Sequence, residues 1–234
     1  MKKRIRELDA IRGLCVLGMV IIHLIYNLTD MYHILSWNTP AIYDFVKNWG
    51  GVLFLLISGI SITLGHHHIK RGLVVFAAGL LVTAVTYGMY RFFDFSKGIM
   101  IYFGVLHCLG ICMLLWGLMR HLPTWALLVL GLGLSALGFW IDALPAVEVS
   151  WLIPVGFVPK NFSTSDYFPL LPYLGFFLLG AFLGRTLYRS RESLFPQWEG
   201  KALPIRFLRF CGRQSLWIYL LHQPILTGIC MLML

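Results

Sequence analysis

Three histidines lie inside long apolar stretches of the chain: His23, His107 and His222. An imidazole is the side chain best suited to take up and return a proton near neutral pH. Ionisable groups within apolar segments are costly, and they usually face the interior of a helix bundle, where they mark functional sites. These histidines are therefore the first candidates for general acid–base chemistry or for contact with a bound ligand.

A polar stripe runs along the segment that holds the first of these histidines. Asp9, Arg12, His23 and Asn27 fall within about 40° of one line when the segment is drawn as an α-helix. Lipid would not tolerate such a stripe, so it is expected to face other helices or a water-filled cavity. A chain of interhelical hydrogen bonds is the alternative interpretation, because such bonds commonly hold membrane bundles together.

Further candidates lie outside or at the ends of the apolar stretches. His33 and Asp44 flank a short polar loop, and Asp166 precedes another apolar stretch. A carboxylate beside an imidazole fixes its tautomer and stabilises its cation, which is what acid–base catalysis needs. The loop is long enough for His33 and Asp44 to meet, and Asp44 could then orient His33.

Composition indicates the elements that must position these groups. Of the 234 residues, 59% are hydrophobic and 12% are charged, and the mean hydropathy is +0.78. A soluble domain would carry about 25% charged residues, so lipid is the expected solvent. The sequence predicts one all-α domain over residues 1–234, a polytopic bundle of seven helices of about 17 to 25 residues each. These helices are expected at residues 10–28, 44–65, 72–90, 100–119, 124–141, 168–188 and 212–232.

The distribution of Lys and Arg predicts the orientation. With the N-terminus inside and the C-terminus outside, fifteen of the 19 Lys and Arg residues fall on the inner side. The net charge of +9 is then explained by topology and by attraction to anionic lipid rather than by nucleic-acid binding. No cleavable signal peptide is evident. We expect a multi-pass protein of the cytoplasmic membrane.

Metal binding is not expected, and self-association is possible. The five cysteines lie in or beside the predicted spans without the paired spacing of a zinc site, which favours a packing role. The run of histidines at 66–68 is interpreted as a solvated helix end. Small residues of the fifth helix would permit close packing within one chain or in a homodimer; they are Gly131, Gly133, Ser135 and Gly138.

Five motifs together resemble a known family. They are "LDAIRGLCVLGMVIIH" (8–23), "GVLFLLISGISI" (51–62), "FGVLHCLGI" (103–111), "DYFPLLPYLGFFLLGAFLGR" (166–185) and "GRQSLWIYLLHQPI" (212–225). They look like the bacterial membrane proteins grouped with the catalytic domain of heparan-alpha-glucosaminide N-acetyltransferase. The resemblance covers most of the chain except the loops at 142–160 and 189–205. The first motif is shared more broadly with membrane acyltransferases.

The resemblance implies a transmembrane acetyltransferase. Such an enzyme takes acetyl-CoA from the cytosolic side and acetylates an amine of a sugar on the far side. In lysosomal members a Trp-Asn pair and then an Asp follow the catalytic His, and "HILSWNTPAIYD" places His33, Trp37, Asn38 and Asp44 in a similar arrangement. His33 is shifted by about two positions, and those members carry Asn at the place of His23. The catalytic role could therefore belong to His33, to His23, or to both.

These observations lead to one hypothesis for the mechanism. Arg12 and Arg213 would hold the phosphates of acetyl-CoA through charge-assisted hydrogen bonds. The pantetheine arm would pass His222 and His107 and bring the thioester to His23 and His33. A neutral His would act as general base, or would carry the acetyl group itself. The residues expected at the oxyanion or at the acceptor are Asn27, Asn38 and Asp166.

Two other functions remain open at this stage. Intramembrane histidines could bind haem, although no helix shows two His at a spacing that would face one haem pocket. They could also relay protons in a proton-coupled transporter, although no pair of spans shows inverted-repeat symmetry. A coloured protein would support the first alternative, and substrate flux without acetyl-CoA would support the second.

Overall fold

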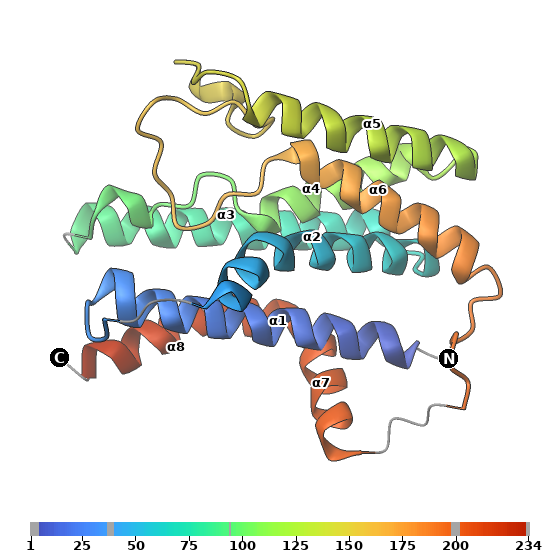
Figure 1. Cartoon of the computed structure of the whole chain (residues 1–234), viewed down its shortest axis with the longest axis horizontal. Coiled ribbons are helices and arrows are strands. Elements are labelled where there is room, and N and C mark those ends of the chain that lie inside the picture. Colours follow the sequence, from blue (N-terminus) through green and yellow to red (C-terminus); the bar gives the residue numbers. More distant parts are fainter. Residues whose placement is uncertain (1–4, 37–39, 94, 198–201, 233–234) are drawn as a thin grey trace. The chain divides into compact units, whose positions relative to one another are not determined.

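This structure, a computed structural model, describes residues 5–36, 40–93, 95–197 and 202–232. Within these residues the ordered elements are helices, and a single isolated bridge joins Phe103 to Tyr167. The α-helices are α1 (Arg6–Tyr26), α2 (Ala41–Leu64), α3 (His68–Phe92), α4 (Val105–Met119), α5 (Thr124–Asp142), α6 (Leu170–Leu187), α7 (Leu203–Arg213) and α8 (Ser215–Leu232), drawn in Figure 1. The short helices are η1 (Asn27–Met31), η2 (Lys97–Ile99) and η3 (Ser150–Leu152).

The prediction of an all-α, polytopic membrane bundle is confirmed. In the described part of the chain, six helices are long and apolar enough to cross a membrane: α1 with η1, α2, α3, α5, α6 and α8. The fourth predicted span corresponds to α4, which is apolar but has only 15 residues. It is shorter than predicted because its first turn begins at Val105, after the extended residue Gly104.

One helix was not predicted. Helix α7 lies in the basic segment 189–211, and extends two residues into the expected last span. Arg206, Arg209 and Arg213 interrupt the apolar residues of this 11-residue helix, so no long apolar run marks it. Pro204 near its start suits the first turn of a helix, where the missing N–H would have no partner in any case. The last span therefore begins at Ser215, after α7 has ended.

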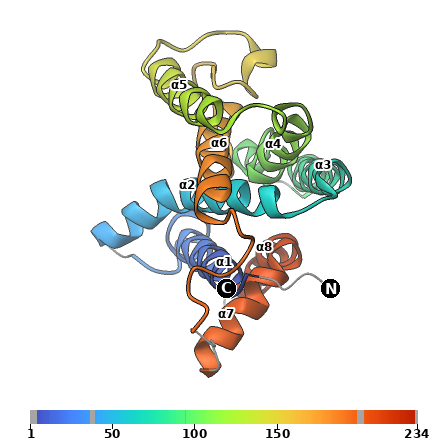
Figure 2. The ribbon, with the colours of Figure 1, turned by 90° about the vertical axis from the view of Figure 1, so that its right-hand side faces the viewer.

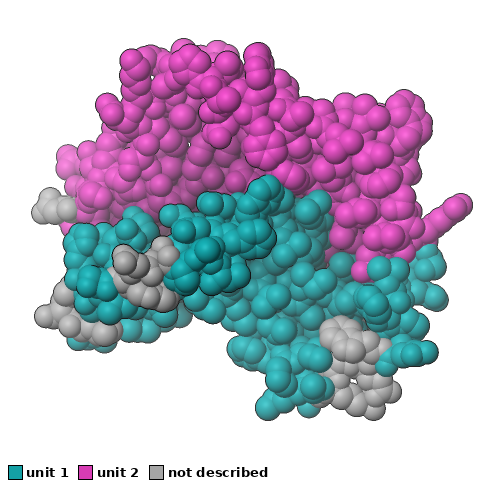
Figure 3. Space-filling view, in the orientation of Figure 1, with its two compact units in different colours: residues 1–57, 190–234 teal, residues 58–189 magenta. Residues whose placement is uncertain are grey.

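The chain divides into two compact units, coloured in Figure 3. The first unit consists of residues 1–57 and 190–234, and the second of residues 58–189. The first unit therefore holds α1, η1, the greater part of α2, α7 and α8. The second unit holds the end of α2 together with α3 to α6.

In the first unit, α1 packs against both α7 and α8. Figures 1 and 2 show α8 running alongside α1, whereas α7 crosses α1 steeply and projects away from it. The crossing brings two backbones together at Gly13 and Gly212. A methyl group at Gly13 would collide with the carbonyl oxygen of Leu208, and one at Gly212 with that of Asp9. Glycine is needed at both positions because only hydrogen fits between the two helices.

In the second unit, α3 packs against α4, α5 against α6, and α4 against α6. The small residues predicted to allow close packing do so within the chain: Gly131 lies against Leu179 of α6, and Gly138 against Pro172. Ser135 is also buried on this face. Gly133, by contrast, faces open space. The close α5–α6 contact therefore uses three of the four predicted residues.

The loop before α6 is held by the half-buried phenol of Tyr167. Tyr167 donates its hydroxyl proton to the carbonyl oxygen of Ile153 at 2.7 Å. Burial raises the pKa of Tyr167 above its usual range, and the charge of Asp142 raises it further. The phenol therefore stays protonated and keeps this hydrogen bond at any physiological pH.

Candidate active site in the α1–α8 helix pair

The polar stripe of α1 is directed into the first unit. Asp9 and Asn27 are buried, and Asn27 has no exposed surface at all. His23 lies one turn before Asn27, on the same side of the helix. Its ring packs against that of His222 on α8, with the ring centroids 4.8 Å apart and the planes at 58°. The stripe therefore meets α8 at two imidazoles, as expected for polar groups that avoid lipid.

Backbone contacts fix the proton on one nitrogen of each ring. His222 Nδ1 lies 2.5 Å from the carbonyl oxygen of Tyr219, and His23 Nδ1 lies 3.0 Å from that of Met19. A carbonyl oxygen only accepts, so in each case Nδ1 carries the hydrogen and donates it. In a neutral ring that donates from Nδ1, Nε2 is an acceptor. Both imidazoles thus have the tautomer that a general base requires.

His222 Nε2 has no hydrogen-bond partner among the described residues, although it is buried. A buried polar atom without a partner is rare in folded proteins, because removing it from water costs free energy that no contact returns. Such an atom indicates that a ligand or a reacting group supplies the missing hydrogen-bond partner. The lone pair of His222 Nε2 can accept a proton from an N–H or O–H group.

An amide pair lies next to the two histidines. Asn27 Nδ2 donates to Gln223 Oε1 at 3.1 Å, and this contact joins α1 to α8. Asn27 Oδ1 is buried and has no partner in the described part of the chain. Asn27 also begins η1, where the helix widens to a π-helical turn, and such turns are frequent at functional sites. The α1–α8 contact therefore holds two buried acceptor atoms that have no partner among the residues the structure describes.

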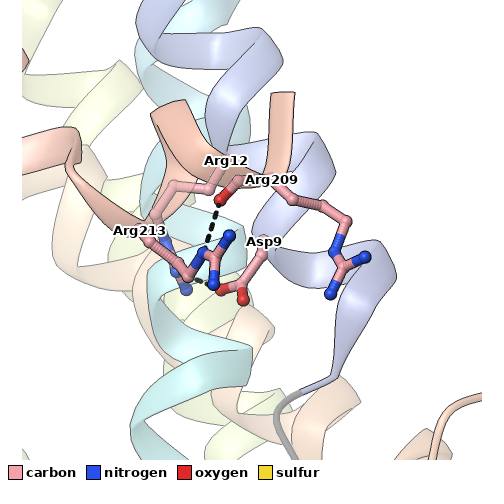
Figure 4. Close-up of polar contacts among 4 residues, drawn as sticks. All are labelled: Asp9, Arg12, Arg209 and Arg213. Carbon is pink, nitrogen blue, oxygen red and sulfur yellow. Dashed lines mark hydrogen bonds and ion pairs between the residues drawn. The ribbon is translucent and has the colours of Figure 1, made fainter. Parts of the chain in front are cut away.

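A basic cluster lies toward the other end of α1, where α7 crosses it. Arg12 Nη1 is 3.3 Å from the carboxylate of Asp9, and Arg213 Nε donates to the carbonyl oxygen of Arg209 at 3.2 Å. In Figure 4 Arg213 turns toward Asp9 and Arg12, whereas the side chain of Arg209 extends away from them. Arg213 is exposed and Arg12 only partly so. The cluster therefore carries a net positive charge at the point where the two helices cross.

The helix itself sets the spacing between the basic cluster and the histidines. His23 lies eleven positions after Arg12 on one continuous helix. At 1.5 Å per residue this is about 16 Å, or roughly half the hydrocarbon thickness of a bilayer. A linear ligand lying along α1 could thus touch the arginines at one end and the imidazoles at the other.

His33 and Asp44 both belong to the first unit, and their predicted pairing stays a prediction. His33 follows η1, is exposed, and adopts a φ of 50°, which is uncommon for a residue other than glycine. Its Nδ1 lies 3.0 Å from the carbonyl oxygen of Thr29. Asp44 is exposed in the first turns of α2, and no hydrogen bond or ion pair links it to His33 within the described residues. Asn38 lies outside the described residues.

His107 belongs to the second unit, where both of its ring nitrogens have partners. Its Nδ1 accepts the backbone N–H of Gly104 at 3.2 Å, so Nε2 carries the hydrogen. His107 Nε2 lies 3.3 Å from Thr83 Oγ1, which in turn donates to the carbonyl oxygen of Ile101 at 2.7 Å. This continuous chain of donors and acceptors joins α3, α4 and the loop between them. The ligand-binding role of His107 stays a prediction.

Asp166 also belongs to the second unit and lies at the start of α4. Its Oδ2 accepts the backbone N–H of Val105 at 3.1 Å. The first N–H groups of a helix have no partner within it, and an acidic side chain there satisfies one of them and favours the helix dipole. Asp166 therefore caps α4 from a distant part of the sequence. Its predicted contact with an acceptor remains untested.

Sequence analysis missed two residues near α1, one on α8 and one on α7. Gln223, the partner of Asn27, was visible only as a polar residue beside His222 in an apolar segment. Arg209 has a buried Nε atom without a partner in the described part of the chain, and no motif singled it out. Both lie 182 residues or more after Asn27 in the sequence, so their place beside α1 depends on tertiary packing.

Comparison with known proteins identifies the family. The family model described as "Heparan-alpha-glucosaminide N-acetyltransferase, catalytic" matches residues 4–224, which takes in residues of both units. No curated protein and no solved structure matches the chain. The family match covers the α1 stripe, the basic cluster and the histidine pair together. The chain therefore belongs to the heparan-alpha-glucosaminide N-acetyltransferase catalytic family.

Proposed function

We propose that the protein is a transmembrane acetyltransferase that transfers an acetyl group from cytosolic acetyl-CoA to an amine or hydroxyl of a sugar-like acceptor on the outer side of the membrane. Membership of the family supports acetyl transfer in general. The distribution of Lys and Arg supports an inner side at the basic cluster of Arg12 and Arg213. The catalytic centre in this proposal is the pair of His23 and His222.

One observation carries the proposal: His222 Nε2 is buried without a partner in the described part of the chain, and it lies beside a second imidazole. The hydrogen bond from His222 Nδ1 to Tyr219 holds the ring so that the lone pair of Nε2 is available. A positioned base of this kind contributes about 10²–10⁴-fold to a proton-transfer reaction. Protonation of the ring would remove the lone pair, so the neutral form is the active one.

The reaction follows from this arrangement. The acceptor nitrogen or oxygen attacks the carbonyl carbon of the thioester, and His222 Nε2 takes its proton. A bond forms between the acceptor atom and the acetyl carbon, and the C–S bond breaks. CoA leaves as a thiolate, and the imidazolium returns the proton to its sulfur. His23 supplies a second imidazole through which this proton can pass. Transfer through an acetyl-histidine would use the same Nε2 atom as nucleophile.

The position of Asn27 fits contact with the acceptor. One N–H of its Nδ2 is donated to Gln223, and Oδ1, which can only accept, has no partner among the described residues. An oxyanion needs donors, whereas an attacking amine or hydroxyl offers N–H or O–H groups. In this proposal Asn27 Oδ1 orients the acceptor, and Gln223 is a positioning residue that keeps the amide of Asn27 in that orientation.

A transfer assay tests the proposal. The purified chain in proteoliposomes, supplied with acetyl-labelled CoA and with glucosamine or a hydroxyl-only sugar, is expected to form an acetylated sugar and free CoA in equal amounts. The measurement is label recovered in the sugar and thiol released, each followed over time. Liposomes without protein give the background. Absence of transfer to either sugar, in preparations that bind acetyl-CoA, would contradict the proposal.

A further inference from the structure

Helix α7 is too short to cross a membrane. Its 11 residues, Leu203–Arg213, span about 16 Å, against about 30 Å of hydrocarbon. It crosses α1 steeply near the N-terminal end of that helix (Figures 1 and 2). If α1 spans the bilayer, α7 therefore lies roughly parallel to the membrane surface. The distribution of Lys and Arg places this end of α1 on the inner side.

One side of α7 is fixed against α1. Cys211 and Gly212 are buried, and the backbone of Gly212 touches that of Asp9. Leu208 lies against Gly13 in the same way. This contact determines which side chains of α7 face outward, because a helix held by its backbone cannot rotate about its axis. The other two sides of α7 lie outside this backbone contact.

The side away from α1 is apolar and exposed. Leu203, Phe207 and Phe210 are 76%, 55% and 53% exposed. Their spacing of four and three residues places them within about 60° of one another around the helix. Three large apolar side chains in one row cost free energy in water, and aromatic rings are typical of the membrane–water interface.

The flank between these two sides is basic. Arg206, Arg209 and Arg213 follow one another at spacings of three and four residues, and they lie about 90° around the helix from the apolar row. Arg206 and Arg213 are exposed. An apolar row beside a row of arginines is the pattern of a helix that lies in the interface, with its rings among the acyl chains and its guanidinium groups at the headgroups.

We propose that the exposed surface of α7 is a docking surface for anionic phospholipid, with Phe207 and Phe210 in the acyl region and Arg206 against the phosphate of the headgroup. Charge complementarity selects the lipid, since a cationic row attracts anionic headgroups and gains little from zwitterionic ones. Arginine suits this role because its planar guanidinium binds phosphate oxygens in pairs. The proposal is independent of acetyl transfer, because it concerns the outer surface of α7 and not the histidine pair.

A binding measurement on the full chain tests this surface. The purified protein in neutral detergent is titrated with fluorescent phosphatidylglycerol and, separately, with fluorescent phosphatidylcholine. We expect phosphatidylglycerol to bind about tenfold more tightly. Arg206→Gln should weaken its binding about fivefold, as expected for one arginine near an anionic surface, and should leave phosphatidylcholine unchanged. Arg206→Lys should restore much of the loss.

Matched controls make the result specific. Arg91→Gln removes an exposed arginine from the end of α3, and it should leave binding of both lipids unchanged. Thermal unfolding of each variant in the same detergent checks that the fold is intact. Arg206 is exposed, so its replacement should not disturb the fold. Equal affinity for the two lipids, or equal loss in Arg206→Gln and Arg91→Gln, would overturn the proposal.

Discussion

Replacing His222 by alanine is expected to lower kcat for acetyl transfer by about 10²–10⁴-fold, the usual contribution of a positioned general base. The substitution removes the buried Nε2 lone pair and the ring that contacts His23. KM for acetyl-CoA should change far less, because the proposal places the phosphates at the basic cluster of Arg12 and Arg213. The measurement is the initial rate of acetyl transfer at saturating acetyl-CoA. His23→Ala should also reduce kcat, through loss of the second imidazole.

The control for this prediction is His33→Ala. His33 is exposed and its ring contacts the backbone of Thr29 in η1, so this variant should keep more activity than His222→Ala. The order of His33, Trp37, Asn38 and Asp44 along the sequence is the reason for the competing expectation that His33 is catalytic. Loss of activity in His33→Ala with full activity in His222→Ala would move the catalytic centre from the α1–α8 pair to the loop.

Replacing Arg213 by glutamine is expected to raise KM for acetyl-CoA by about tenfold or more with little change in kcat. One charge-assisted hydrogen bond contributes about 1.5–3 kcal/mol, which corresponds to this range. Arg213 is the cleaner choice because it is exposed. Arg12 is bound to Asp9, so its removal would leave a buried carboxylate without its cation. The measurement is the dependence of the initial rate on acetyl-CoA concentration at fixed acceptor.

Arg206→Gln is the matched control, since it removes an arginine of the same helix that faces outward. Assayed in neutral detergent, it should leave KM for acetyl-CoA unchanged while weakening the binding of anionic lipid. An equal rise of KM in both variants would mean that α7 attracts the nucleotide through its total charge alone. A fall in kcat without a change in KM for Arg213→Gln would contradict its assignment to phosphate binding.

The membrane fold could be predicted because its main determinant is local. Each long apolar run must satisfy its own backbone hydrogen bonds in lipid, and only a helix does so within one segment. The polar stripe of α1 could be predicted for the same reason, since the positions of Asp9 and Asn27 on one helix follow from residue spacing. Burial of both residues within the first unit agrees with that expectation.

Helix α7 could not be predicted in this way. Its apolar residues are interrupted by arginines, and its length is well below that of a span. What defines it is close backbone packing on α1 at Gly13 and Gly212, and two glycines about 200 residues apart give no signal in one sequence. Periodicity over residues 203–213 was the available clue, with Leu203, Phe207 and Phe210 at helical spacing.

The pairing of His23 with His222 also depends on tertiary structure. Each residue was identified separately, because an ionisable group in an apolar segment is costly and usually has a function. Nothing in the spacing along the chain indicates that the two rings meet, or that Asn27 selects Gln223 as its partner. The tautomer of each ring follows only from the backbone carbonyl that it contacts, which a sequence does not show.

The structure of the protein with bound acetyl-CoA would test the central claim most directly. We expect the phosphates at Arg12 and Arg213 and the thioester carbonyl within reach of His222 Nε2, with the arm of the ligand lying along α1. The distance of about 16 Å between Arg12 and His23 sets the length that the arm must cover. A thioester bound away from both His23 and His222, with these rings still packed on each other and unliganded, would contradict the account.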